Sequence, residues 1–123
     1  MKIWASTTIE KIWGTTEPLV RTPMFELHRL HIWPGMRCSL HVHQFKHNCF
    51  YVISGELFID SVNGEFAPAG TIKLLPGRVQ TVRPGVHHQF HTELSGCVAL
   101  EMYYTEPLSE DIVRRNIGGA YHG

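Results

Sequence analysis

Charge of either sign is scarce in this 123-residue sequence. Only 18% of the residues are charged, and 11 Lys and Arg balance 11 Asp and Glu, so the formal net charge is zero. A protein without a basic excess lacks the electrostatic attraction that favours nucleic acids and anionic membranes. We therefore expect neither partner. Because 43% of the residues are hydrophobic, a compact folded body is expected rather than a disordered chain.

Long apolar runs and paired cysteines are missing as well. No stretch approaches the roughly 20 apolar residues of a membrane-spanning helix, and residues 1–13 do not form the unbroken apolar segment of a signal peptide. Cys38, Cys49 and Cys97 form no Cys-x-x-Cys pair, which argues against a disulfide framework or a zinc ribbon. The sequence thus predicts a cytoplasmic protein with reduced thiols, of which Cys38 is the candidate for reactivity.

Short β-rich runs make up most of the chain and predict an all-β fold. Turn pairs such as Pro34-Gly35 and Asn63-Gly64 separate these runs, which favours an antiparallel sandwich or barrel. The length fits one domain over 1–123. The predicted parts are an arm or edge strand over 1–24, a barrel over 25–104 and a C-terminal segment over 105–123. The predicted strands cover residues 25–32, 38–43, 49–54, 56–60, 71–75, 79–82, 88–92 and 97–104.

The one helix signal lies near the C-terminus. Ser109 could cap a short helical turn, and Glu110 and Asp111 would suit its first residues because acids favour a helix N-terminus. One or two turns are expected there.

Nine histidines are many for so short a chain, and three of them suggest a metal site. His41 and His43 are two residues apart, so in a strand both imidazoles would lie on one face. Farther along, His88 and Phe90 would share a face, and since Phe90 is expected in the core, His88 should point there too. The spacing therefore predicts that the three imidazoles face a common interior.

These residues resemble the two motifs of the cupin superfamily. The first motif is matched by Gly35, His41, His43, Asn48 and Gly55, and the second by residues 77–90. The resemblance implies a cupin-type double-stranded β-helix, or jelly-roll barrel, that holds one divalent metal ion, such as zinc, manganese, iron or nickel, through three His and one Glu. Here His41, His43 and His88 would be ligands, and Asn48 stands in the glutamate position.

Asn48 changes the expected chemistry of that centre. An amide oxygen is neutral, so the site would keep one more unit of positive charge and bind a divalent ion less tightly. His47 is an alternative fourth ligand, presented from the turn before the next strand.

Residues 98–104 and 108–114 are similar to the end of the C-terminal cupin domain of type II mannose-6-phosphate isomerases. That resemblance implies an isomerase of sugars or sugar phosphates, in which the metal stabilises an enediolate while a carboxylate moves a proton. Glu101 is the candidate base, because it lies in an otherwise apolar strand where burial would raise its pKa. An ion pair with Lys or Arg is the alternative role for Glu101.

Other activities remain open. A three-His centre would also suit an iron-dependent dioxygenase, and a barrel that only binds a small molecule such as a saccharide, with a regulatory role, needs no chemistry. The candidates for holding an anionic group of the ligand in the barrel mouth are Arg37, Lys46, Lys73 and Arg78. The family resemblance also implies a homodimer, for which Trp4 and Trp13 of the N-terminal segment could supply contacts.

Overall fold

The computed structural model describes residues 2–3, 7–63, 67–105 and 117–120, and its regular elements are all strands. The strands are β1 (Lys2–Ile3), β2 (Ile9–Lys11), β3 (Gly14–Thr22), β4 (Phe25–Ile32), β5 (His47–Gly55), β6 (Leu57–Asn63), β7 (Ala67–Leu74), β8 (Val79–Val82), β9 (His87–His91) and β10 (Cys97–Tyr104). All pairings between them are antiparallel. The predicted all-β jelly-roll barrel is therefore confirmed.

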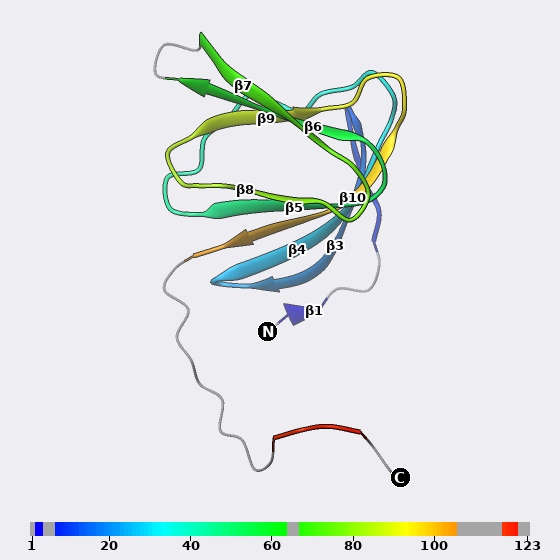
Figure 1. The fold of residues 1–123 in the computed structure, drawn as a ribbon, viewed down its shortest axis with the longest axis vertical. Coiled ribbons are helices and arrows are strands. Elements are labelled where there is room, and N and C mark those ends of the chain that lie inside the picture. Colours follow the sequence, from blue (N-terminus) through cyan, green and yellow to red (C-terminus); the bar gives the residue numbers. More distant parts are fainter. Residues whose placement is uncertain (1, 4–6, 64–66, 106–116, 121–123) are drawn as a thin grey trace.

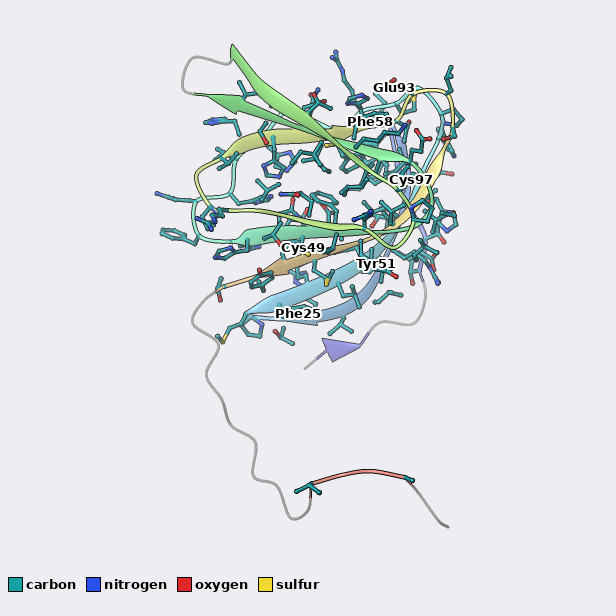
Figure 2. The ribbon with its side chains drawn as sticks, viewed as in Figure 1. Phe25, Cys49, Tyr51, Phe58, Glu93 and Cys97 are labelled. Carbon is teal, nitrogen blue, oxygen red and sulfur yellow. The ribbon has the colours of Figure 1, made fainter. Side chains whose placement is uncertain are left out.

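Two sheets face each other across the core (Figure 1). The larger has the order β1-β3-β4-β10-β5-β8, with β2 also paired to β3, and the smaller has the order β7-β6-β9. Side chains from both sheets fill the space between them (Figure 2). The rings of Phe50 and Phe90 meet there with centroids 6.0 Å apart, and both residues are at most 2% exposed.

The N-terminal segment contributes more to the sheet than the sequence suggested. β3 pairs with β4 along most of its length, from Gly14↔Ile32 to Thr22↔Phe25. β1 and β2 pair with the other edge of β3. Trp13 packs in the core edge-on to Phe90, with ring centroids 5.0 Å apart. Trp4, the other tryptophan named for a subunit contact, lies outside the described residues.

The predicted strand over 38–43 is wrong as a regular element. This segment runs beside β9, but only two isolated bridges, Arg37↔His91 and His41↔His88, join them. The pairing shifts by one residue between the two bridges, which is the signature of a bulge that interrupts a ladder and redirects the side chains after it. His41 lies directly after this irregularity.

Two glycines are required where strands approach closely. A Cβ on Gly14 would lie 1.9 Å from the carbonyl oxygen of His31, and one on Gly55 would lie 1.9 Å from that of Gly96. Gly55 also has a φ of +79°, in the left-handed region that favours glycine. The glycine that ends the first motif thus serves the turn between β5 and β6.

The helical turn predicted around Ser109, Glu110 and Asp111 lies outside the described residues. Within the part of the chain that the structure describes, no helix is long and apolar enough to cross a membrane.

Candidate metal centre

His41, His43 and His88 converge at one end of the barrel interior. Each offers a ring nitrogen, and these nitrogens all lie within 4.8 Å of one another. His88 comes from β9, where alternate residues point inward, and it is 1% exposed. Two backbone hydrogen bonds join His41 and His88: the His41 N–H donates to the His88 carbonyl oxygen at 3.0 Å, and the His88 N–H donates to that of His41 at 2.8 Å. The two motifs therefore meet through the backbone, although His41 and His88 are 47 positions apart in the sequence.

Two of the imidazoles are oriented by backbone carbonyls. Nδ1 of His41 lies 2.7 Å from the carbonyl oxygen of Ser39, and Nδ1 of His88 lies 2.9 Å from that of Val86. Because a carbonyl oxygen only accepts, Nδ1 of His41 carries the proton and its Nε2 keeps a lone pair, and the Val86 carbonyl favours the same tautomer of His88. This is the arrangement in which a protein prepares a histidine to bind a metal through Nε2.

Nε2 of His43 is buried and has no hydrogen-bond partner among the described residues. Burial, together with the neighbouring His41 and His88, lowers the pKa of His43 to about 4. Burial also lowers the pKa of His88. The imidazoles of His43 and His88 are thus kept neutral, the form that ligates metals.

Asn48 is fully buried at the start of β5 and completes the cluster. Its Nδ2 donates to Oε2 of Glu101 and to the carbonyl oxygen of Met102, each at 3.3 Å. These two acceptors fix the orientation of the amide, so Oδ1 is the atom that lies 2.9 Å from Nε2 of His88. The amide oxygen and the Val86 carbonyl oxygen therefore face the two ring nitrogens of His88, and both oxygens are acceptors.

A neutral imidazole has one proton and can donate to only one of these two oxygens, so at its other nitrogen two lone pairs face each other, which is unfavourable unless a cation lies near both. A second proton on His88 would supply that charge, but burial opposes it. A divalent ion would satisfy both atoms, since two donors each about 2.1 Å from an ion and at right angles to it are about 3 Å apart. The residues present therefore fit a metal, with Asn48 in place of the usual glutamate.

His47, the alternative fourth ligand, points away from this cluster. β5 already begins at His47, so Asn48 faces inward and His47 faces outward. The His47 ring is stacked on Tyr104, with centroids 5.0 Å apart. The structure favours Asn48 over His47.

Glu101 is buried beside Asn48, as expected from its apolar strand, and is 7% exposed. Burial raises its pKa to about 7, although hydrogen bonds from Tyr103 and Asn48 oppose this shift. The ion pairs of Lys and Arg among the described residues join Arg29 to Glu17, Lys46 to Glu26 and Lys73 to Glu56. None of them reaches Glu101, so the alternative of a salt-bridged Glu101 is not what the structure contains.

A cavity of about 250 Å³ opens between His41 and Glu101. Its lining comes from the larger sheet, from the segments before β3 and β5 and, through Phe90 of β9, from the smaller sheet; the residues are Lys11, Trp13, Thr16, His28, Cys38, Ser39, His41, Phe90, Glu101 and Tyr103. The Tyr103 ring also contacts that of His43, with centroids 5.1 Å apart. The cavity is thus polar on the side of the histidines and aromatic on the side of the core.

Two sequence predictions about other side chains need correction. Cys38 is 8% exposed, and burial raises the pKa of its thiol to about 12, so it is not a reactive cysteine. Lys73, a candidate for holding an anion, lies on β7 in an ion pair with Glu56 and outside the cavity lining. Lys11, which does line the cavity, was missed because nothing in its local sequence shows the register of β2 against β3.

The family profile described as "Cupin domain" matches residues 28–102. The chain belongs to the cupin family. The match includes both histidine-bearing segments and Glu101, but not β1 to β3 of this cupin. No curated protein matches the sequence.

Solved structures agree with this assignment. The cupin is similar to Lactobacillus farciminis oxalate decarboxylase in a formate complex, with a TM-score of 0.69 and 16% identity over 85% of this chain and 32% of that one. It is similar to KdgF from Halomonas sp., with a TM-score of 0.69 and 12% identity over 82% and 87% of the two chains.

A third similar structure is Bacillus subtilis oxalate decarboxylase with its Mn(II) centres, at a TM-score of 0.69 and 15% identity over 84% of this chain and 28% of that one. This cupin spans about a third of the length of the decarboxylases. At such identities the likeness shows the fold alone. The reaction must therefore be argued from the site.

Proposed function

We propose that this cupin is a metal-dependent isomerase that moves a proton between neighbouring carbons of a sugar or sugar phosphate. The observation that carries the proposal is that His41 and Glu101 line one cavity. The same small cavity is therefore lined by a candidate metal ligand, His41, and by the buried carboxyl group of Glu101. The resemblance of residues 98–104 to type II mannose-6-phosphate isomerases supports the choice of substrate class.

His41, His43, Asn48 and His88 would hold the ion. When bound, it would act as a Lewis acid on carbonyl and hydroxyl oxygens of the substrate. All four ligands are neutral, so none of the charge of a divalent ion would be offset by the protein atoms that hold it. This favours a substrate that becomes more negative during the reaction.

Glu101 would accept and return the proton. Asn48 holds its Oε2 at 3.3 Å, and Tyr103 is hydrogen-bonded to the same carboxyl group. These contacts fix the direction of the carboxyl group, and the absence of a salt bridge from Lys or Arg of the described residues leaves it able to take up a proton. Trp13 and Phe90 supply an apolar part of the cavity wall beside this carboxyl group.

The test follows the exchange of a substrate proton with solvent. The metal-loaded protein is incubated with mannose 6-phosphate in deuterated water, and deuterium at carbon 2 is measured by NMR. We expect incorporation by the wild type, and a loss of 10²-fold or more, on the order expected for a general base, in Glu101→Gln. Glu10→Gln is the control because Glu10 is exposed on β2. Equal exchange by Glu101→Gln and wild type would show that Glu101 is not the base.

A further inference from the structure

Lys11 faces the same interior as the candidate metal ligands. β2 pairs with β3 in the register Ile9↔Thr16 and Lys11↔Gly14, and paired residues of an antiparallel ladder project to the same face. Thr16 is 6% exposed and points into the barrel. Ile9 and Lys11 therefore lie on the inner face of their strand, and Lys11 forms part of the cavity wall together with His41.

Lys11 has no acidic partner among the described residues that would neutralise it. Lys46, in contrast, forms an ion pair in which its Nζ lies 3.6 Å from Oε2 of Glu26, and the same Nζ lies over the ring of Tyr103. Lys11 takes part in none of the ion pairs that join Lys or Arg to Glu within the described residues. The positive charge of Lys11 nevertheless acts on Glu101 in the same cavity, because it lowers the pKa of Glu101, although burial raises that pKa by more.

The charge balance of the cavity favours an anion. Three His and one Asn would leave a bound divalent ion with its full charge, and Lys11 adds another positive charge on the same wall. Glu101 is the one acid in the lining, so it offsets only part of this charge. A neutral ligand would leave the excess uncompensated, whereas an oxyanion would neutralise it through charge-assisted hydrogen bonds at the exposed side of the cavity, where Lys11 lies.

We propose that Lys11 binds an oxyanion group of the substrate, so that this cupin takes sugar phosphates or sugar acids and discriminates against neutral sugars. This inference rests on the proposed function for the identity of the substrate as a sugar. The inference goes beyond the proposed function by assigning the selectivity for the anionic group to one residue of β2. Lys11 is a specificity-determining residue, and it takes no part in moving the proton.

Binding to the metal-free protein tests the inference without activity. Mannose 6-phosphate, inorganic phosphate and mannose are each titrated into ¹⁵N-labelled protein, and binding is followed at the indole N–H of Trp13 and the amides of Gly14 and Thr16. We expect the two phosphates to bind more tightly than mannose. Lys11→Met should weaken both phosphates on the order of tenfold, the value of one charge-assisted hydrogen bond, and should leave mannose unchanged. Lys11→Arg should retain phosphate binding, and Lys73→Met, which changes a lysine outside the cavity, should match the wild type.

The outcomes separate this inference from the proposed isomerase. Phosphate binding that depends on Lys11, in a protein that exchanges no substrate proton, would support the role of Lys11 and contradict the isomerase. Proton exchange with equal phosphate affinity in Lys11→Met and wild type would overturn the role of Lys11 and leave the isomerase standing. Tighter binding of mannose than of mannose 6-phosphate, or no phosphate-induced shifts at Trp13, Gly14 or Thr16, would also overturn it.

Discussion

Oδ1 of Asn48 lies 2.9 Å from Nε2 of His88, and the carbonyl oxygen of Val86 lies 2.9 Å from Nδ1 of the same ring, so a neutral His88 can donate to only one of its two acceptors. The amide is held by Glu101 and Met102, and the imidazole by Val86, so neither group can turn away without losing those bonds. The pair connects the three-histidine cluster to the buried carboxyl group of Glu101. A cation at this point would make the arrangement favourable, and this leads to the first predictions.

Metal content is the first of them. We expect the purified protein to bind one divalent ion, and His41→Ala and His88→Ala to lose it, because each removes an Nε2 lone pair from the cluster. His31→Ala is the control, since His31 is exposed on β4 and lies 3.8 Å from Glu17. Elemental analysis gives the stoichiometry.

The identity of the ion decides between the remaining activities. Zinc or manganese would support the isomerase, whereas iron together with oxygen uptake would favour a dioxygenase. No binding even in excess zinc, manganese and iron would contradict the metal centre and make this cupin a barrel that only binds a small molecule.

Asn48→Asp should affect metal affinity and metal-free stability in opposite directions. The new carboxylate would strengthen binding of a divalent ion, because it replaces a neutral oxygen by a charged one. Without metal it would lose the donor to Glu101 and Met102, which should cost about 1–3 kcal/mol of unfolding free energy. Competition with a chelator and urea denaturation measure the two effects. Weaker metal binding by Asn48→Asp would show that residue 48 is not a ligand.

Thiol reactivity should follow burial. Burial raises the pKa of Cys38 to about 12 and that of Cys97 to about 11, and both side chains are at most 8% exposed. Cys49 is the half-buried one of the three. We therefore expect Cys49 to react first with a thiol reagent in the native protein, and all three to react in guanidinium chloride. Rapid labelling that persists in Cys49→Ser would contradict this order.

The outer face of the smaller sheet should make stability depend on pH. His91 lies between Asp60 and Glu93, at 2.6 and 2.9 Å, near the end of the sheet where Figure 2 labels Phe58 and Glu93. Burial alone would lower the pKa of His91, but hydrogen bonds to Glu93 and Asp60 raise it above 6.5. Burial alone would raise the pKa of Asp60, but hydrogen bonds from Thr71, Gln89 and His91 hold it below 3.8.

The sign of the effect follows from these directions. The stabilisation by His91 is complete below its unfolded pKa, near 6.5, and is lost as the pH rises through its higher folded pKa. The stabilisation by Asp60 is present above a pH of about 4 and is lost as the pH falls through the depressed pKa of Asp60 in the folded state. Urea denaturation in the presence of a chelator should therefore show that the free energy of unfolding declines above pH 6.5, and that this decline is absent in His91→Gln. Because the groups are partly exposed, the decline should amount to less than about 1 kcal/mol. Equal pH profiles would contradict this interpretation.

The homodimer implied by the family resemblance is tested by sedimentation velocity of the full chain, and a monomer would rule it out. Removal of residues 1–15 is unsuitable as a test of the interface. It would delete β2 and Trp13, whose ring packs on Phe90 in the core, and truncating a buried tryptophan to alanine alone typically costs about 3–5 kcal/mol. Loss of the dimer in that variant could then reflect unfolding.

Local patterns were sufficient for much of the barrel. Strands such as Phe25–Ile32 and Cys97–Tyr104 have the predicted bounds, because alternation of apolar residues and glycine-bearing turns act over a few neighbours. The same period of two placed His88 and Phe90 on one buried face and Glu101 in the interior. The segment carrying His41 and His43 was placed beside the site although its regular strand was wrong, since its bulge depends on pairing with β9.

By itself, the sequence determined which residues could serve as ligands, because this depends on residue type, and that His88 and Glu101 lie on the buried faces of their strands, because this depends on a two-residue repeat. Only the tertiary structure decided that Asn48 rather than His47 meets His88, since this depends on where β5 begins relative to its partner strands. It also placed Lys11 in the cavity and Trp13 in the core. Those positions follow from the register of strands that are brought together by burial of side chains distant in the sequence, and no local pattern encodes that register.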